Sequence, residues 1–335
     1  MGNYISDLTN KQSLSQGAAY DCLSAIFKGD VQDSDIKTLL GGLAEKGESV
    51  DEIVGFARSM RDHMVSVDFG EQVIDLCGTG GSGKNRFNVS TASAFLLSAL
   101  DVSVAKHGNR GSKKANGSFD FLEALDIPFT GDVDTLGLIF KNNHLCFLFA
   151  RNHHPAMKYV ASARKELGIK TIFNLIGPLC NPANVKYQVI GTTTKALAEK
   201  LSFSLQERGV HRAMVVIGGD GRDELSLTGT SQIFDVTEDF VDLLEFSPED
   251  MGIADDLGPY CFETARQNDK FKDHPLANFI RNDAKENFKL ALGETAKDYI
   301  IDASPGKGNW VNNPWINIMD ERVTTTAEDG YYPVY

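Results

Sequence analysis

Apolar residues recur at helical spacing through the first part of the chain. A serine precedes each of three predicted helices, and a glycine ends the first two, in the ranges 15–29, 34–47 and 49–64. Ser49 and Glu52 have the spacing of a capping box, in which each side chain bonds the other residue's backbone N–H. Because helices this short need a partner surface, the segment is expected to pack on the rest of the chain or on another subunit.

From residue 73 onward, short apolar runs alternate with helical patterns. Strands are predicted at 73–76, 102–105, 146–150, 187–192, 213–218 and 232–236. This alternation is typical of an open α/β sheet. The remainder is poorly patterned: residues 285–301 could form a helix and a strand, and 304–335 are rich in Pro, Gly and Asn.

A glycine-rich loop follows the first predicted strand. Gly78-Thr79-Gly80-Gly81 lets a ligand approach the backbone N–H groups closely, because glycine has no side chain. Asn88, Ser90 and Thr91 then precede a helical pattern, and a helix N-terminus favours an anion. Together these features predict a phosphate cradle. The glycine spacing fits neither the dinucleotide pattern GxGxxG nor a P-loop.

A basic segment leaves the second predicted strand. Lys106-His107-Gly108-Asn109-Arg110 places two permanent cations and a histidine at the carboxyl end of that strand. In an open α/β sheet this edge is where ligands bind. Two neighbouring crossovers suited to anions indicate a ligand with two phosphate groups. The alternative is that the glycines are turns and that Lys106 and Arg110 are solvated cations.

Two further strand ends carry side chains suited to chemistry. Asp223-Glu224 lies in a glycine-bearing loop after the strand at 213–218, and adjacent carboxylates can hold Mg²⁺ that also binds substrate phosphates. The alternative is a solvated acidic turn. His154 follows the strand at 146–150, where a histidine can equally be a capping or core residue.

Composition narrows the class of protein. The net charge of −13 argues against general binding to nucleic acid or to an anionic membrane, and no apolar run is long enough to span a membrane. Five cysteines are scattered without metal-ligand spacing, which predicts reduced thiols in a cytoplasmic protein and no zinc site. At 335 residues the chain is long enough for two domains.

The segments in this order resemble one known family, the anthranilate phosphoribosyltransferases of tryptophan biosynthesis, which share their architecture with pyrimidine-nucleoside phosphorylases. The likeness lies within about residues 15–236, in Gly78 to Gly81, Asn88 to Thr91, Lys106 to Arg110, His154-Pro155, Arg164, Thr171 to Leu179, Asn181 to Ala183 and Asp223 to Ser226. The resemblance implies a glycosyltransferase that moves the 5-phosphoribosyl group of phosphoribosyl pyrophosphate to the amine of anthranilate, with Mg²⁺.

The resemblance also implies an organisation. We expect an α/β fold with a small N-terminal helical domain at 1–67, which part of 155–185 could join, and a larger α/β domain at 68–335 with a mostly parallel central sheet. The last 30 or so residues are expected to be irregular. The helical domain would form a homodimer, and the partners would be small-molecule substrates, without nucleic acid or membrane.

Site residues carry over position by position. The donor would be bound by Gly78, Thr79, Gly80, Gly81, Ser82, Arg86, Asn88, Ser90, Thr91, Lys106 and Ser118. The acceptor would be bound by His107, Asn109, His154, Arg164 and Pro178, with Arg164 facing the anthranilate carboxylate. The metal would be held by Ser90, Asp223 and Glu224. No acid or base is assigned, because an aromatic amine is already nucleophilic.

Departures from the family pattern fall mostly on the donor side. Ser82 stands where the family has Asp, Arg86 where it has Thr or Ser, and Lys113 to Asn116 alter a serine-rich loop. Added cations could compensate for lost phosphate contacts through Coulomb attraction. The alternatives are another aromatic acceptor, a nucleoside phosphorylase, or a catalytically silent phosphate-binding paralogue.

Overall fold

The computed structural model describes residues 1–80, 88–111, 115–226, 229–251 and 282, together with two strands at 299–304 and 315–320. The chain packs as two compact units, one of Met1–Leu225 with Ser231–Glu245 and the other of Ser226–Thr230 with Phe246–Tyr335. The predicted fold class, a helical domain followed by an α/β domain with a mostly parallel sheet, is confirmed. The predicted boundary between residues 67 and 68 stays a prediction.

Four helices open the first unit: α1 (Gly2–Thr9), α2 (Gln16–Lys28), α3 (Asp33–Lys46) and α4 (Val50–Asp62). The predicted capping box of Ser49 and Glu52 is present at the start of α4. The start predicted for the second helix is wrong, because α3 begins at Asp33 and includes Ser34. Acidic side chains in the first turn favour this start through the helix dipole. Helix α1 was not expected, because its residues read as a polar stretch.

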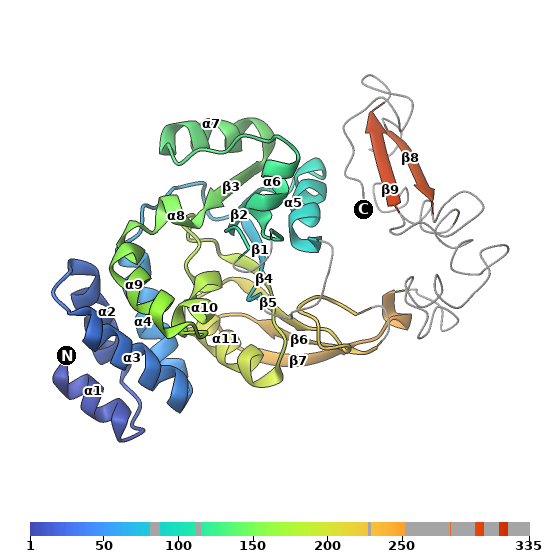
Figure 1. The fold of residues 1–335 in the computed structure, drawn as a ribbon. Helices are drawn as coiled ribbons and strands as arrows, with labels where there is room; N and C mark the ends of the chain where they lie inside the picture. Colours follow the sequence, from blue (N-terminus) through green and yellow to red (C-terminus); the bar gives the residue numbers. More distant parts are fainter. Residues whose placement is uncertain are drawn as a thin grey trace. The chain divides into compact units, whose positions relative to one another are not determined.

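The bundle is completed by segments from much later in the chain. These are α9 (Lys158–Leu167), α10 (Ile172–Ile176) and the short 3₁₀ helices η1 (Pro155–Met157) and η2 (Gly177–Leu179). Fully buried Leu23, Leu39 and Phe56 share one core with Val160 and Ile172. The same core continues into the sheet and α11, so the bundle and the sheet bury apolar surface against each other. Figure 1 shows the bundle gathered beside the sheet.

The central sheet has seven strands in the order β3-β2-β1-β4-β5-β6-β7. The strands are β1 (Ile74–Gly78), β2 (Val104–Gly108), β3 (Leu145–Phe149), β4 (Tyr187–Gly191), β5 (Arg212–Ile217), β6 (Ser231–Val236) and β7 (Val241–Phe246). Strands β1 to β5 pair in parallel, and β6 runs antiparallel to β5. The chain extends to one side of β1 and then to the other, so the switch point lies between β1 and β4, where ligands bind in such sheets.

Helices connect the strands: α5 (Val89–Ala99), α6 (Ser118–Ala124), α7 (Val133–Asn143), α8 (Ala150–His153) and α11 (Lys195–Glu207). Helix α7 was not predicted, although Asp132 caps it by accepting from the backbone N–H of Thr135 at 2.9 Å. Strand β2 begins at Val104 rather than at residue 102, so Lys106 and His107 lie within the strand and not in a loop after it.

The second unit contains η3 (Glu249–Met251) and a two-stranded antiparallel sheet. Strands β8 (Tyr299–Ser304) and β9 (Trp315–Asp320) pair with Tyr299 opposite Asp320 and Ser304 opposite Trp315. Strand β9 therefore lies in the stretch that was expected to be irregular. Within the ranges that the structure describes, no helix is long and apolar enough to cross a membrane.

Candidate active site

The glycine loop begins at the switch point of the sheet. Gly78 ends β1 opposite Gly191 of β4, and the Thr79 backbone N–H donates to the Gly191 carbonyl at 2.9 Å. Gly80 has a φ of +69°, in the left-handed region that glycine adopts without steric cost. The sequence therefore needs glycine here to turn the chain across the end of the strand. Gly81, Ser82 and Arg86 lie at 81–87, outside the described residues.

The N-terminus of α5 faces the same strand end. Asn88 caps the helix, and its Oδ1 accepts from the Thr91 backbone N–H at 3.3 Å and from the Thr91 hydroxyl at 2.8 Å. Ser90 donates to the same oxygen at 3.4 Å and accepts from the Lys106 ammonium at 3.1 Å. Helix terminus, hydroxyl and cation thus meet in one place, which suits a phosphate group.

Lys106 is a buried cation, only 2% exposed, and also donates to the Leu76 carbonyl. The alternative that it is solvated is wrong. Asp75, in the middle of β1, is fully buried nearby. Burial raises the pKa of Asp75 and lowers the pKa of Lys106, and each group's charge partly offsets the shift of the other.

The acidic loop reaches the glycine loop. A Cβ added to Gly78 would lie 2.9 Å from Oδ2 of Asp223, so the carboxylate rests against bare backbone at the end of β1. Asp223 is 5% exposed and Glu224 half-buried, while the neighbouring Asp220 is ion-paired with Arg222 at 3.1 Å. The carboxylate at the cradle fits Mg²⁺, which prefers oxygen ligands.

The described residues offer few protein ligands to a metal ion. Among the described residues, no group of three or more His, Cys, Asp or Glu side chains could hold a metal ion. Mg²⁺ commonly takes one or two carboxylates and completes its shell with water and substrate phosphates. We call the glycine loop, the α5 N-terminus, Lys106 and Asp223 the donor half of the site.

A buried pair of histidines joins the neighbouring strand β2, which holds His107, to His154 at the end of α8. His107 Nε2 and His154 Nε2 are 3.2 Å apart, and their ring centroids are 5.1 Å apart. Burial is the main cause that lowers both pKa values, that of His154 to about 4, and nearby histidines add to the effect. Both rings are therefore neutral at neutral pH, and one donates its N–H to the other.

Two polar strand residues that the sequence analysis missed, Asp75 and Gln188, hold His107 and Pro178. Asp75 accepts from the His107 backbone N–H at 3.2 Å and from Gln188 Nε2 at 3.1 Å. Gln188 also donates to the Pro178 carbonyl at 2.7 Å. The only sequence signal for them was one carboxylate and one amide, each inside an otherwise apolar strand. Both are buried with satisfied hydrogen bonds, which fixes His107 and Pro178 relative to each other.

Arg164 comes from α9 in the helical bundle. It is half-buried, donates to Asn174 Oδ1 at 3.4 Å and lies 5.3 Å over the Phe173 ring. Burial lowers the pKa of its guanidinium. Its contacts within the described part of the chain do not include the histidine pair. We call His107, His154, Pro178 and Arg164 the acceptor half of the site.

The remaining predicted residues lie around the basic loop. Asn109 is exposed and its side chain accepts from the Arg110 backbone N–H at 2.8 Å. Arg110 is not a free cation, because it pairs with Glu123 on α6 and lies 4.9 Å from the Phe149 ring centre. Ser118 is buried, and its Oγ would lie 2.0 Å from a Cβ at Gly108. Residues 112–114 lie outside the described ranges.

Family models match successive parts of the chain. A helical bundle domain of a glycosyl transferase family matches residues 3–64, and the a/b domain of the glycosyl transferase family matches 70–268. Residues 261–335 match a different model, the MrcB-like N-terminal domain. The C-terminal stretch thus has a likeness of its own.

Several proteins and solved structures are similar to the chain. The anthranilate phosphoribosyltransferase of Halalkalibacterium halodurans is 41% identical over 84% of this chain and 83% of its own length. That of Geobacillus stearothermophilus is 43% identical over 74% of each. The Thermus thermophilus enzyme superposes with a TM-score of 0.69 at 35% identity, covering 75% of this chain and 74% of its own.

The Saccharomyces cerevisiae enzyme has been solved in complex with PRPP and Mg, with a TM-score of 0.64 at 27% identity over 72% of this chain and 71% of its own. A variant in complex with 4-fluoroanthranilate gives 0.61 at 25% identity, over 74% and 72%. These identities span most of the chain. The chain therefore belongs to the anthranilate phosphoribosyltransferase family.

Proposed function

We propose that the chain transfers the 5-phosphoribosyl group of phosphoribosyl pyrophosphate to the amine of anthranilate and releases pyrophosphate. One observation carries the proposal: the Asp223 carboxylate rests on Gly78 at the same strand end where Lys106 meets Ser90. His107 of the neutral histidine pair lies one residue further along β2. The names of the relatives support both substrates.

The donor half would hold the leaving group. Pyrophosphate departs from C1 of the ribose through a cation-like transition state, so the protein needs mainly to bind charge and exclude water. Mg²⁺, when bound, neutralises the phosphate oxygens. Asp223 and Glu224 would hold it, and Ser90 would hold it or a phosphate. Lys106, Asn88 and the backbone of the glycine loop would position the pyrophosphate.

The acceptor half would aim the amine. Arg164 would bind the anthranilate carboxylate, for which a guanidinium is well shaped. In the neutral pair of His107 and His154, one ring uses its acceptor nitrogen on the other. The nitrogen that remains can accept a hydrogen bond from the amine without forming a cation beside the developing positive charge at C1. The release of one amine proton can follow bond formation, so the geometry requires no strong base.

The test is the loss of anthranilate fluorescence when the purified full chain is mixed with phosphoribosyl pyrophosphate and Mg²⁺. Turnover that stops on addition of a chelator is the expected result. No turnover in a sample shown by circular dichroism to be folded overturns the proposal. Donor binding in that sample is then measured by calorimetry. An enzyme for another acceptor should bind the donor and turn it over once that acceptor is supplied, whereas a silent phosphate-binding paralogue should show no turnover with any acceptor.

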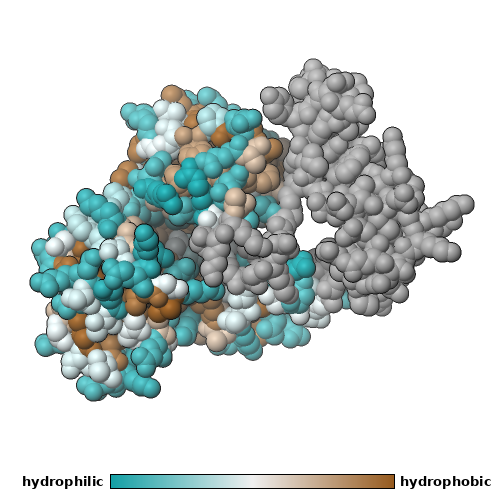
Figure 2. All heavy atoms as spheres, viewed as in Figure 1, coloured by the Kyte–Doolittle hydropathy of each residue, from teal (hydrophilic) through white to brown (hydrophobic). Residues whose placement is uncertain are grey.

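We also propose a cytoplasmic homodimer formed through the helical bundle. Reduced thiols support the location, because the four described cysteines are all free. Apolar side chains on the viewed surface of the bundle, shown as brown patches in Figure 2, support the interface. Sedimentation of a single species with the mass of one chain at micromolar concentration would overturn the dimer.

A further inference from the structure

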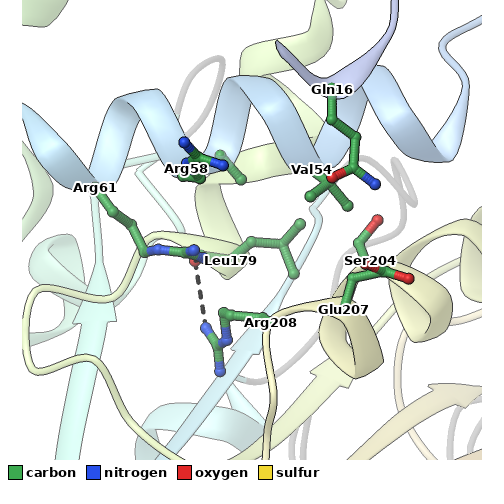
Figure 3. Close-up of a pocket in the computed structure, with 9 residues that line it drawn as sticks. Gln16, Val54, Arg58, Arg61, Leu179, Ser204, Glu207 and Arg208 are labelled. Carbon is green, nitrogen blue, oxygen red and sulfur yellow. Dashed lines mark hydrogen bonds between the residues drawn. The ribbon is translucent and has the colours of Figure 1, made fainter. Parts of the chain in front are cut away.

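A cavity of about 120 Å³ lies between the helical bundle and α11. It is lined by Gln16, Val54, Ala57, Arg58, Arg61, Leu179, Ser204, Glu207 and Arg208. Figure 3 shows Arg61, reaching from α4, and Arg208, from the end of α11, on either side of Leu179. Gln16, Ser204 and Glu207 lie at the other end. None of these residues takes part in either half of the active site.

Two half-buried arginines, Arg61 and Arg208, converge on one neutral acceptor. Arg61 Nη1 and Arg208 Nη1 both donate to the Leu179 carbonyl, at 3.4 and 3.3 Å. Arg208 Nη2 also donates to the Val185 carbonyl at 2.9 Å and to Gln188 Oε1 at 3.3 Å. Among the ion pairs of the described residues, none includes either guanidinium.

This arrangement compensates the positive charge only in part, since the Asp75 carboxylate raises the pKa of Arg208 without an ion pair to it among the described contacts, and it leaves N–H donors unused. A guanidinium has five N–H donors, and Arg61 uses one of them, in a long hydrogen bond. Burial first, and the charge of Arg61 second, lower the pKa of Arg208 to about 10. Two like charges near each other in a partly desolvated place are costly unless an anion joins them. Arg58 adds a third cation, stacked 4.7 Å over the Tyr20 ring.

The polar groups at the other end of the cavity do not supply that anion. The Ser204 hydroxyl donates to the Lys200 carbonyl at 2.7 Å, and Gln16 donates to Asp51 at 3.0 Å. Glu207 is exposed on the rim. The volume equals that of roughly four waters at about 30 Å³ each, enough for one tetrahedral ion.

We propose that this cavity binds a small tetrahedral oxyanion, a phosphate or sulfate group, between Arg61 and Arg208. The site is separate from the donor half. Its occupant would keep Arg208 in place, and Arg208 contacts Gln188, which holds Asp75 and the Pro178 carbonyl. The anion would therefore stabilise the same hydrogen bonds that fix the acceptor half.

The test is calorimetric titration of the full chain with inorganic phosphate at constant ionic strength. Because the donor half also binds phosphate, two binding events are expected. Arg61→Gln should weaken one event at least tenfold, whereas Ser90→Ala should weaken the other. Lys141→Gln, which removes the same charge from an exposed position on α7, should change neither.

The proposal is overturned if Arg61→Gln binds phosphate as the wild type does. It is also overturned if Lys141→Gln loses as much phosphate affinity as Arg61→Gln. If Arg61→Gln does not fold, anomalous diffraction from wild-type crystals soaked in selenate decides. A peak between the two guanidinium groups supports the site, and peaks confined to the glycine loop overturn it. A parallel titration with glycerol phosphate distinguishes a free ion from an ester, because only the free ion fits the volume with its full affinity.

Discussion

The donor half and the acceptor half of the site are built in opposite ways. The donor half combines groups of opposite charge, Lys106 within β2 and Asp223 against the bare backbone of Gly78 at the end of β1. The acceptor half consists of neutral rings and one half-buried arginine, taken from the sheet and from the helical bundle. One half is suited to holding a charged leaving group, and the other to orienting the neutral amino group of a small acceptor.

This difference predicts how strongly each half responds to substitution. Removing one partner of a buried charged pair costs much free energy, because the remaining charge is left in a low dielectric. Substitution of a neutral ring, or of an arginine that faces a ligand, removes only the contacts of that side chain. Substitutions in the donor half are therefore expected to have larger effects than those in the acceptor half.

The largest effect is expected for Lys106→Met. Loss of the cation that meets Ser90 should lower kcat/KM for the donor by about 10³-fold. Because Asp75 then stays buried without the countercharge of Lys106, unfolding in urea should show a loss of about 3 kcal/mol. Adding Asp75→Asn should restore stability but not activity. Wild-type donor kinetics in Lys106→Met would contradict the donor assignment.

A second substitution tests the metal. Asp223→Asn should lower turnover by about 10²-fold and raise the Mg²⁺ concentration needed for half-maximal rate, because an amide is a weaker ligand than a carboxylate. Asp220→Asn is the matched control in the same loop, since Asp220 pairs with Arg222. Identical Mg²⁺ curves for Asp223→Asn and the wild type would remove Asp223 from the metal site.

On the acceptor side, Arg164→Gln should raise KM for anthranilate roughly 30-fold and leave donor KM unchanged, which corresponds to about 2 kcal/mol for one charge-assisted pair. Lys165→Gln, an exposed neighbour on the same helix, should leave both constants unchanged. Steady-state kinetics with each substrate varied in turn provide the measurement. An unchanged acceptor KM would place the carboxylate elsewhere.

The smallest effect at neutral pH is expected for His154→Gln. Burial lowers the pKa of His154 to about 4 in the folded chain from the ordinary histidine value of 6.5, so below pH 6.5 the unfolded chain binds more protons. Stability should therefore fall as the pH drops from 6.5 towards 4, by about 3 kcal/mol from this group. His154→Gln should flatten that fall, measured by urea unfolding at several pH values. Exposed His211→Gln is the control, and equal slopes would contradict the assignment.

Features of the donor half can be read from the sequence more directly than the contacts of the acceptor half, and the reason is distance along the chain. The glycine loop and the α5 cap are local patterns, readable within about twenty residues. His107 and His154 meet only because β2 and β3 pair in register, with His107 opposite Leu148. Asp75 and Gln188 were missed because a buried polar residue inside a strand has no local signature. Helix α7 was missed because Gly137 and Asn143 weaken its propensity.

The helical bundle has a consequence for the order in which the chain can fold during synthesis. Its first four helices are complete by residue 62, yet their core also contains Val160, Ala163, Ile172 and Ile176. When those residues leave the ribosome, strands β1 to β3 have already emerged. The bundle therefore cannot bury its core as an early, independent step, and its completion coincides with assembly of the first half of the sheet. Nascent chains arrested before residue 158 should accordingly remain sensitive to protease throughout the first four helices.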